Sequence, residues 1–118
     1  MLRVLVVDDT PDVRMLVRAV LESTGLYEIV DMAVDGREAV ALATMHQPDV
    51  IVIDQMMPDL SGSEAVPLLR DASPSARIVM FSAVSAEVMA ARSDGADGHV
   101  NKGDLEGLIN TLAALTSG

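Results

Sequence analysis

The sequence predicts a single α/β domain in which helices cover both faces of a parallel sheet. The chain has 118 residues, which suits one domain, and 50% of them are apolar, which is enough for a hydrophobic core. Short runs of valine and isoleucine alternate with longer stretches whose apolar residues repeat at helical spacing. Strands that alternate with helices are joined by right-handed crossovers, so we expect a doubly wound parallel sheet with five strands and five helices.

The predicted strands are mostly continuous apolar runs, as is typical of strands that are covered on both faces. Residues 4–7 form the first, and residues 28–33 form a weaker second one. Residues 50–53 and 77–81 form the third and fourth strands, and residues 98–101 form a fifth that rests mostly on one valine.

The first two predicted helices lie between these strands. Apolar residues between positions 13 and 21 fall on one helical face, with Pro11 suited to the first turn and Gly25 to the C-terminal stop. A second pattern, between residues 39 and 43, must end before Pro48.

The third and fourth predicted helices are less regular. Pro67 lies inside the apolar pattern of residues 65–69 and lacks a backbone donor, so we expect either a late start or a kink. Ser85 can cap a fourth, alanine-rich helix that Gly95 ends.

The fifth predicted helix covers residues 105–112, with Asp104 as its N-cap. We expect one domain over residues 1–115, followed by a C-terminal tail or linker start at residues 116–118. The first apolar run stops at Asp8, too early for a signal peptide, and no run is long enough to span a membrane. We therefore expect a cytoplasmic protein.

Composition excludes several classes of function. The chain has no cysteine, which rules out disulfides and thiolate metal sites, and it has only one Tyr, one Phe and no Trp for base stacking. Eight basic residues face eighteen acidic ones, for a formal charge of −10. This charge repels nucleic acid and anionic membranes, so we expect this chain to bind neither directly.

Polar side chains follow four of the predicted strands, at the edge where open parallel sheets bind ligands. They are Asp8 and Asp9, Asp54, Ser82, and Lys102, which is the only lysine of the chain. Each one alone has an ordinary explanation: an Asp-Asp pair is more often a turn and a helix cap, and a lone lysine is usually a solvated charge.

Together these side chains predict something more specific. If the first and third strands are neighbours, three carboxylates converge, and their repulsion costs on the order of 10 kcal/mol. One lysine cannot offset this, so either one Asp is protonated or a divalent cation binds there. Oxygen ligands without His or Cys select Mg²⁺, Mn²⁺ or Ca²⁺ over zinc. With Ser82 and Lys102 opposite, the arrangement is suited to phosphoryl transfer.

The sequence resembles the receiver domains of two-component response regulators, in the CheY-like superfamily. Four segments carry the resemblance across nearly the whole chain: residues 4–9 (VLVVDD), 54–62 (DQMMPDLSG), 81–83 (FSA) and 95–102 (GADGHVNK). The resemblance implies a flavodoxin-like sheet in the order 2-1-3-4-5. It also implies a signalling receiver, and not an enzyme beyond its own Mg²⁺-dependent phosphorylation and dephosphorylation.

By this resemblance, Asp54 is the phosphoacceptor for a phosphohistidine on a sensor histidine kinase or a histidine phosphotransfer protein. Asp9, Asp54 and the backbone carbonyl of Met56 are implied to bind Mg²⁺, with Mn²⁺ as an alternative ion. Asp8 acts on the metal through water.

The resemblance further implies that Ser82 and Lys102 bond phosphoryl oxygens. The fourth helix, fifth strand and fifth helix would then change their surface for a downstream protein target or a fused output domain, and phosphorylation could also drive a homodimer. His99 stands where the family usually has Tyr or Phe; it is either a switch residue or a hydrogen-bonded residue at a strand end. Gly103 replaces the usual proline, which puts the cis peptide common there in doubt.

Three other functions remain open at this point. A flavodoxin shares the topology, but Asp8-Asp9-Thr10-Pro11 is unsuited to cradling a flavin phosphate. A haloacid dehalogenase phosphatase needs a second Asp two residues after the first, where this chain has Thr10. A signal-independent interaction module would keep the fold and lose the chemistry.

Overall fold

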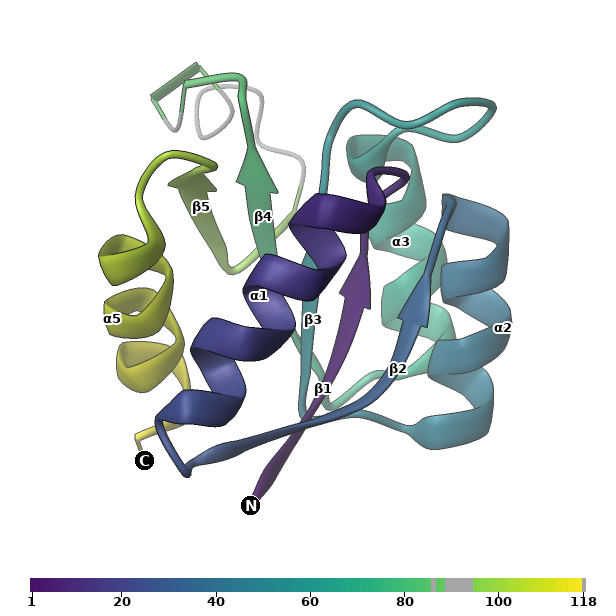
Figure 1. The fold of residues 1–118 in the computed structure, drawn as a ribbon. Helices are drawn as coiled ribbons and strands as arrows, with labels where there is room; N and C mark the ends of the chain where they lie inside the picture. The colour runs from purple at the N-terminus through teal and green to yellow at the C-terminus, as the bar shows by residue number, and fades with distance from the viewer. Residues whose placement is uncertain (86, 89–94, 118) are drawn as a thin grey trace.

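The computed structural model describes residues 1–85, 87–88 and 95–117, and it contains a five-stranded parallel sheet (Figure 1). The strand order is β2-β1-β3-β4-β5, which confirms the predicted doubly wound topology. All five predicted strands are present within two residues of their expected bounds. They are β1 (Leu2–Val7), β2 (Tyr27–Ala33), β3 (Val50–Ile53), β4 (Arg77–Ser82) and β5 (Gly98–Asn101).

Helices cover both faces of this sheet. The described helices are α1 (Pro11–Ser23), α2 (Gly36–His46), α3 (Gly62–Ala72) and α5 (Leu105–Thr116). Figure 1 shows α1 and α5 on one face and α2 and α3 on the other. The predicted fourth helix, from Ser85 to Gly95, lies mostly outside the described residues; Ser85 Oγ accepts a hydrogen bond from Val88 N at 3.3 Å.

Alternate residues of the buried strands supply two separate cores. In β1, Leu5 and Val7 pack with α2 and α3, whereas Val4 and Val6 pack with α1 and α5. This two-sided burial explains why the strands read as continuous apolar runs in the sequence.

Two of the expected helix boundaries are confirmed, and one expectation changes. Asp104 caps α5 by accepting a hydrogen bond from Gly107 N at 2.8 Å, and Gly25 follows α1 with a φ of 74°. A late start of the third helix is wrong: α3 begins at Gly62, where Ser61 and Glu64 form a capping box, and it continues through Pro67. Pro67 is exposed, so its missing backbone donor lies on the solvent side of the helix.

The register of the strands brings four strand ends to one edge. Val7 pairs with Ile53 across β1 and β3, and Ser82 pairs with Asn101 across β4 and β5. The residues that follow these strands therefore meet above the sheet. Among the described residues, no helix is long and apolar enough to cross a membrane; the cytoplasmic location and the boundary at residue 115 stay predictions.

Candidate metal and phosphoacceptor site

Asp8 and Asp54 lie side by side at the carboxyl ends of the neighbouring strands β1 and β3. The Asp54 amide donates to the Val7 carbonyl at 3.0 Å, and the Asp8 amide donates to the Ala33 carbonyl at 3.1 Å. Both residues are almost fully buried, with 2% and 3% of their surfaces exposed. The sheet's own hydrogen bonds thus extend by one residue and fix two acidic residues at the same edge.

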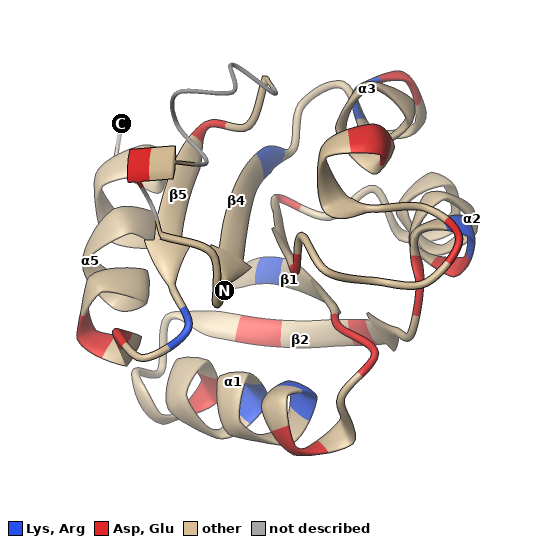
Figure 2. Cartoon of the chain, turned by 90° about the horizontal axis from the view of Figure 1, so that it is seen from above, with Lys and Arg blue, Asp and Glu red and all other residues tan. Residues whose placement is uncertain are grey.

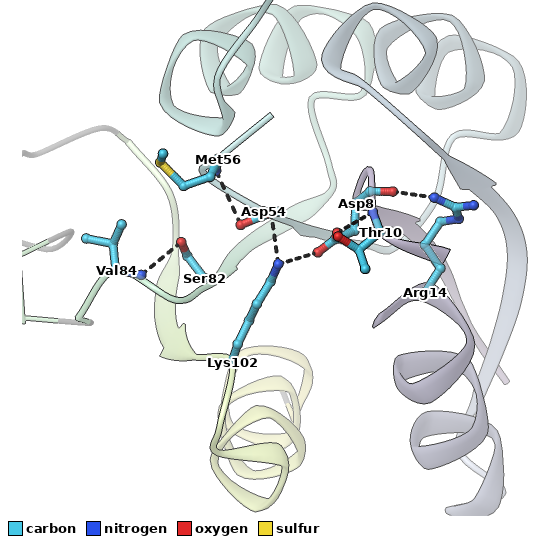
Figure 3. Close-up of polar contacts among 8 residues, drawn as sticks. All are labelled: Asp8, Thr10, Arg14, Asp54, Met56, Ser82, Val84 and Lys102. Carbon is cyan, nitrogen blue, oxygen red and sulfur yellow. Dashed lines mark hydrogen bonds and ion pairs between the residues drawn. The ribbon is translucent and has the colours of Figure 1, made fainter. Parts of the chain in front are cut away.

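Lys102 joins these two carboxylates. Its Nζ lies 2.9 Å from Asp8 Oδ2 and 3.0 Å from Asp54 Oδ2 (Figure 3). The Lys102 amide donates to the Ser82 carbonyl at 2.9 Å, so the β4–β5 ladder continues to the base of this side chain. The peptide bonds of the described residues include no cis bond, so Gly103 follows Lys102 through a trans peptide.

Asp9 completes a group that can hold a cation. One carboxylate oxygen from each of Asp8, Asp9 and Asp54 lies within 4.8 Å of the others. Asp9 is exposed, whereas the other two are buried, so the group opens to solvent on one side. Among the described residues this group consists of three carboxylates with no nitrogen or sulfur ligand, a set that fits the hard, partly hydrated ion Mg²⁺.

The site remains strongly acidic around its single ammonium group. Burial raises the pKa of Asp54, and the charge of Asp8 adds to this, although the hydrogen bond from Lys102 opposes it. Burial alone would lower the pKa of Lys102, but its hydrogen bonds to Asp8 and Asp54 outweigh burial and raise that pKa. Figure 2, seen from above, shows further acidic segments in red on the loops around this edge.

The remaining predicted residues lie around this group in different ways. Met56 N donates to Asp54 Oδ1 at 3.3 Å, which places the Met56 main chain beside the Asp54 carboxylate, and Met56 is 64% exposed. Ser82 is buried at the end of β4, but its Oγ accepts from Val84 N at 3.2 Å and points toward that loop (Figure 3). His99 is half-buried in β5, opposite Met80, and its role as a switch stays a prediction.

Sequence reasoning missed a polar contact that supports the residue after Asp54. Gln55 is buried, and its Oε1 accepts hydrogen bonds from both the amide and the hydroxyl of Ser63 at 2.7 Å. Gly62 N also donates to the Gln55 carbonyl at 3.0 Å. These bonds tie the loop after β3 to the first turn of α3. A polar residue two positions after an apolar strand was the available signal, but its partner is set by tertiary structure.

Two residues of α1 and its entry loop were also missed. Thr10 N donates to Asp8 Oδ1 at 2.9 Å, and Arg14 Nη1 donates to the Asp8 carbonyl at 2.7 Å (Figure 3). The spacing from Asp8 to Arg14 matches no motif that the sequence reasoning used.

Comparison with known proteins gives a consistent result. The family model of the response regulator receiver domain matches residues 4–113. The chain is 42% identical to a protein-glutamate methylesterase/protein-glutamine glutaminase of Geobacter sulfurreducens over 81% of this chain and 26% of that protein. It is 34% identical to the chemotaxis protein CheY of Thermotoga maritima over 74% of this chain and 72% of that one.

The solved structure of the chemotaxis protein CheY4 of Vibrio cholerae superimposes with a TM-score of 0.84 at 34% identity and covers 97% of this chain and 98% of that one. The chain spans about a quarter of the length of the first curated relatives, the methylesterases, so the activity of those whole proteins is not carried over. The match over nearly all of the chain favours the receiver interpretation over the flavodoxin and dehalogenase alternatives. With this match and an acidic group beside a lysine at the predicted edge of the sheet, the chain belongs to the response regulator receiver domain family.

Proposed function

We propose that Asp54 accepts a phosphoryl group from a phosphohistidine of a sensor histidine kinase or a histidine phosphotransfer protein, in a Mg²⁺-dependent reaction. The contact of Lys102 Nζ with Asp54 Oδ2 at 3.0 Å, beside the clustered carboxylates of Asp8 and Asp9, is the observation that carries this proposal. It joins a nucleophile, a cation site and a fixed positive charge at one place.

In the proposed step, a carboxylate oxygen of Asp54 attacks phosphorus, and the bond between phosphorus and the donor imidazole nitrogen breaks. The imidazole takes up a proton as it leaves, and the phosphoryl group ends as a mixed anhydride on Asp54. Bound Mg²⁺ supplies charge stabilisation for the phosphoryl oxygens. Asp9, Asp54 and the Met56 carbonyl would hold the ion directly, and Asp8 would hold it through water.

Lys102 and Ser82 have separate roles in this proposal. The Lys102 ammonium moves from pairing with the Asp54 carboxylate to pairing with an oxygen of the attached phosphoryl group. Ser82 Oγ already accepts from Val84 N, and it keeps a hydroxyl proton that can be donated to another phosphoryl oxygen. Such a bond would draw the loop after β4 toward the site.

The proposed output is a changed surface formed by the fourth helix, β5 and α5. Asn101, Lys102 and His99 connect the site to this side of the sheet, because they lie in or directly after β5. A downstream protein, a fused output domain or a second copy of the chain would read the change.

Incubation with Mg²⁺ and a small acyl phosphate, followed by intact-mass measurement, tests the chemistry. We expect one phosphoryl group to be added to the wild type and to Asp59→Asn. No phosphoryl group should be added to Asp54→Asn, or to the wild type when EDTA is present. Asp59 is a suitable control because it is an exposed aspartate in the same loop. No gain in mass with any donor would overturn the proposed function. Unchanged partner binding in Asp54→Asn, with and without a phosphodonor, would favour the signal-independent module.

A further inference from the structure

We propose that Arg14 is a positioning residue for the metal site, which it serves by holding the peptide that carries Asp9. This inference rests on the proposed Mg²⁺ site. It assigns a role to a side chain that contacts neither the metal ligands' carboxylates nor the phosphoacceptor. The inference is based on the different hydrogen bonds that hold Asp8 and Asp9.

Asp9 is the least supported of the three carboxylates. It is exposed, and within the described part of the chain its carboxylate has no hydrogen bond or ion pair. Asp8, by contrast, has Thr10 N on one carboxylate oxygen and Lys102 on the other. The direction of the Asp9 side chain toward the site therefore depends on its main chain.

That main chain is fixed at the peptide between Asp8 and Asp9. A peptide group is planar, so holding the Asp8 carbonyl also sets the orientation of the Asp9 amide and the position of its Cα. Arg14 Nη1 donates to this carbonyl at 2.7 Å, a short, charge-assisted bond. The Asp8 amide donates to the Ala33 carbonyl, so the main chain of Asp8 is held on its N-terminal side. The hydrogen bond from Arg14 holds its C-terminal side, where Asp9 begins.

The side chain of Arg14 is itself well placed for this role. It is half-buried in the second turn of α1, and its own amide donates to the Thr10 carbonyl at 3.2 Å as part of that helix. Figure 3 shows the guanidinium on the carbonyl side of Asp8, away from Lys102 and Asp54. Arg14 thus connects a rigid helix to the loop that carries two of the three acidic residues.

Charge and geometry predict opposite effects when Arg14 is replaced. A positive charge near a cation site weakens cation binding, so its removal should tighten Mg²⁺ binding by about two- to fivefold if charge alone matters. If Arg14 positions Asp9, its removal should weaken binding, because residues that orient metal ligands typically contribute roughly 10-fold or more in affinity. The sign of the change separates the two explanations.

Isothermal titration of the metal-free chain with Mg²⁺ tests the proposal in the wild type, Arg14→Met, Arg14→Lys and Arg18→Met. We expect Arg14→Met to bind Mg²⁺ about 10-fold more weakly and Arg14→Lys to lie between it and the wild type. Arg18→Met removes the same charge from the same helix, where Arg18 pairs with Glu22 at 3.0 Å, and this variant should bind Mg²⁺ like the wild type.

A second measurement needs no metal. The NMR order parameter of the Asp9 amide should fall in metal-free Arg14→Met and stay unchanged in Arg18→Met. If Arg14→Met does not fold, Arg14→Lys decides, since it keeps the charge and any loss of affinity must come from geometry.

Binding by Arg14→Met and Arg14→Lys at least as tight as that of the wild type would overturn this inference and leave the proposed function intact. Failure of the wild type itself to bind Mg²⁺ would instead overturn both.

Discussion

Replacement of Lys102 by methionine should destabilise the metal-free chain and make its stability depend more strongly on Mg²⁺ than that of the wild type. The substitution keeps most of the side chain's length but removes the positive charge that pairs with the carboxylates of both Asp8 and Asp54. Both carboxylates have side chains that are only 3% exposed, so water cannot replace the lost partner. Two buried negative charges then face each other without the ammonium group that paired with both.

The size of the effect follows from the geometry. At 2.9 and 3.0 Å, and with an effective dielectric of about 20, the Coulomb attraction of each pair is about 6 kcal/mol before the cost of desolvation. Removing one member of a buried pair typically costs about 3–5 kcal/mol. Because the Lys102 side chain is 22% exposed, we expect the low end, about 3 kcal/mol. With a urea m-value of about 2 kcal/mol/M, the midpoint should fall by about 1.5 M.

Urea denaturation at neutral pH, with and without Mg²⁺, measures this effect. Without metal, Lys102→Met should unfold at lower urea than the wild type. Mg²⁺ at about 100 times its Kd should add about 2.7 kcal/mol to the stability of either protein. Because the Lys102→Met site is more negative, it should reach this gain at a lower Mg²⁺ concentration than the wild type. Arg77→Met, which removes an exposed charge from the opposite edge of the sheet, should change little. If Lys102→Met proves as stable as the wild type without Mg²⁺, the electrostatic description of the site is wrong.

Three further predictions follow from the same structure. Gly62→Ala should destabilise the chain by about 1–3 kcal/mol in thermal unfolding, because an added Cβ would clash with the Asp54 carbonyl oxygen. Gly103→Ala should have a mild effect, because its added Cβ would lie 3.4 Å from Asn101 Oδ1. The hydrogen bond from the Ser61 amide holds the pKa of Glu64 below its usual value. The capping box should therefore stabilise the chain at pH values above the unfolded-state pKa of Glu64, and this stabilisation should be lost as the pH falls through the folded-state pKa. Glu64→Gln should make the free energy of unfolding less sensitive to acid. Burial raises the pKa of Asp54. The contribution of Asp54 to stability is therefore greatest below its unfolded-state pKa of about 4 and is lost as the pH rises through its folded-state pKa. An equal pH dependence of the unfolding free energy in Asp54→Asn and the wild type would contradict this.

Much of the fold could be predicted from local patterns. The runs at residues 4–7 and 50–53 are buried on both faces, and this leaves a signal that does not depend on distant contacts. The order of the strands, in contrast, came from the resemblance and not from the runs themselves. Pro67 shows the limit of the local rule that proline interrupts a helix. This proline is tolerated inside α3, where its side of the helix faces solvent.

The candidate site was predictable because its residues directly follow strands, and the edge of a parallel sheet gathers such positions. Which atoms pair could not be predicted in the same way. Lys102 contacts both Asp8 and Asp54, whereas Ser82 turns toward Val84; these choices depend on the packing of loops far apart in the sequence. The support from Arg14 arises from the placement of α1 over the end of β1, for which the sequence carries no local signal.

The identity of the phosphorylated residue tests the central claim most directly. Reduction of the acyl phosphate by borohydride, after reaction with a phosphodonor and Mg²⁺, converts a phosphorylated aspartate to homoserine, which peptide mass spectrometry can locate. Homoserine at position 54 alone is the predicted result. Homoserine at position 8, 9 or 59, or unmodified aspartate at position 54 in a chain that has gained a phosphoryl group, would contradict it.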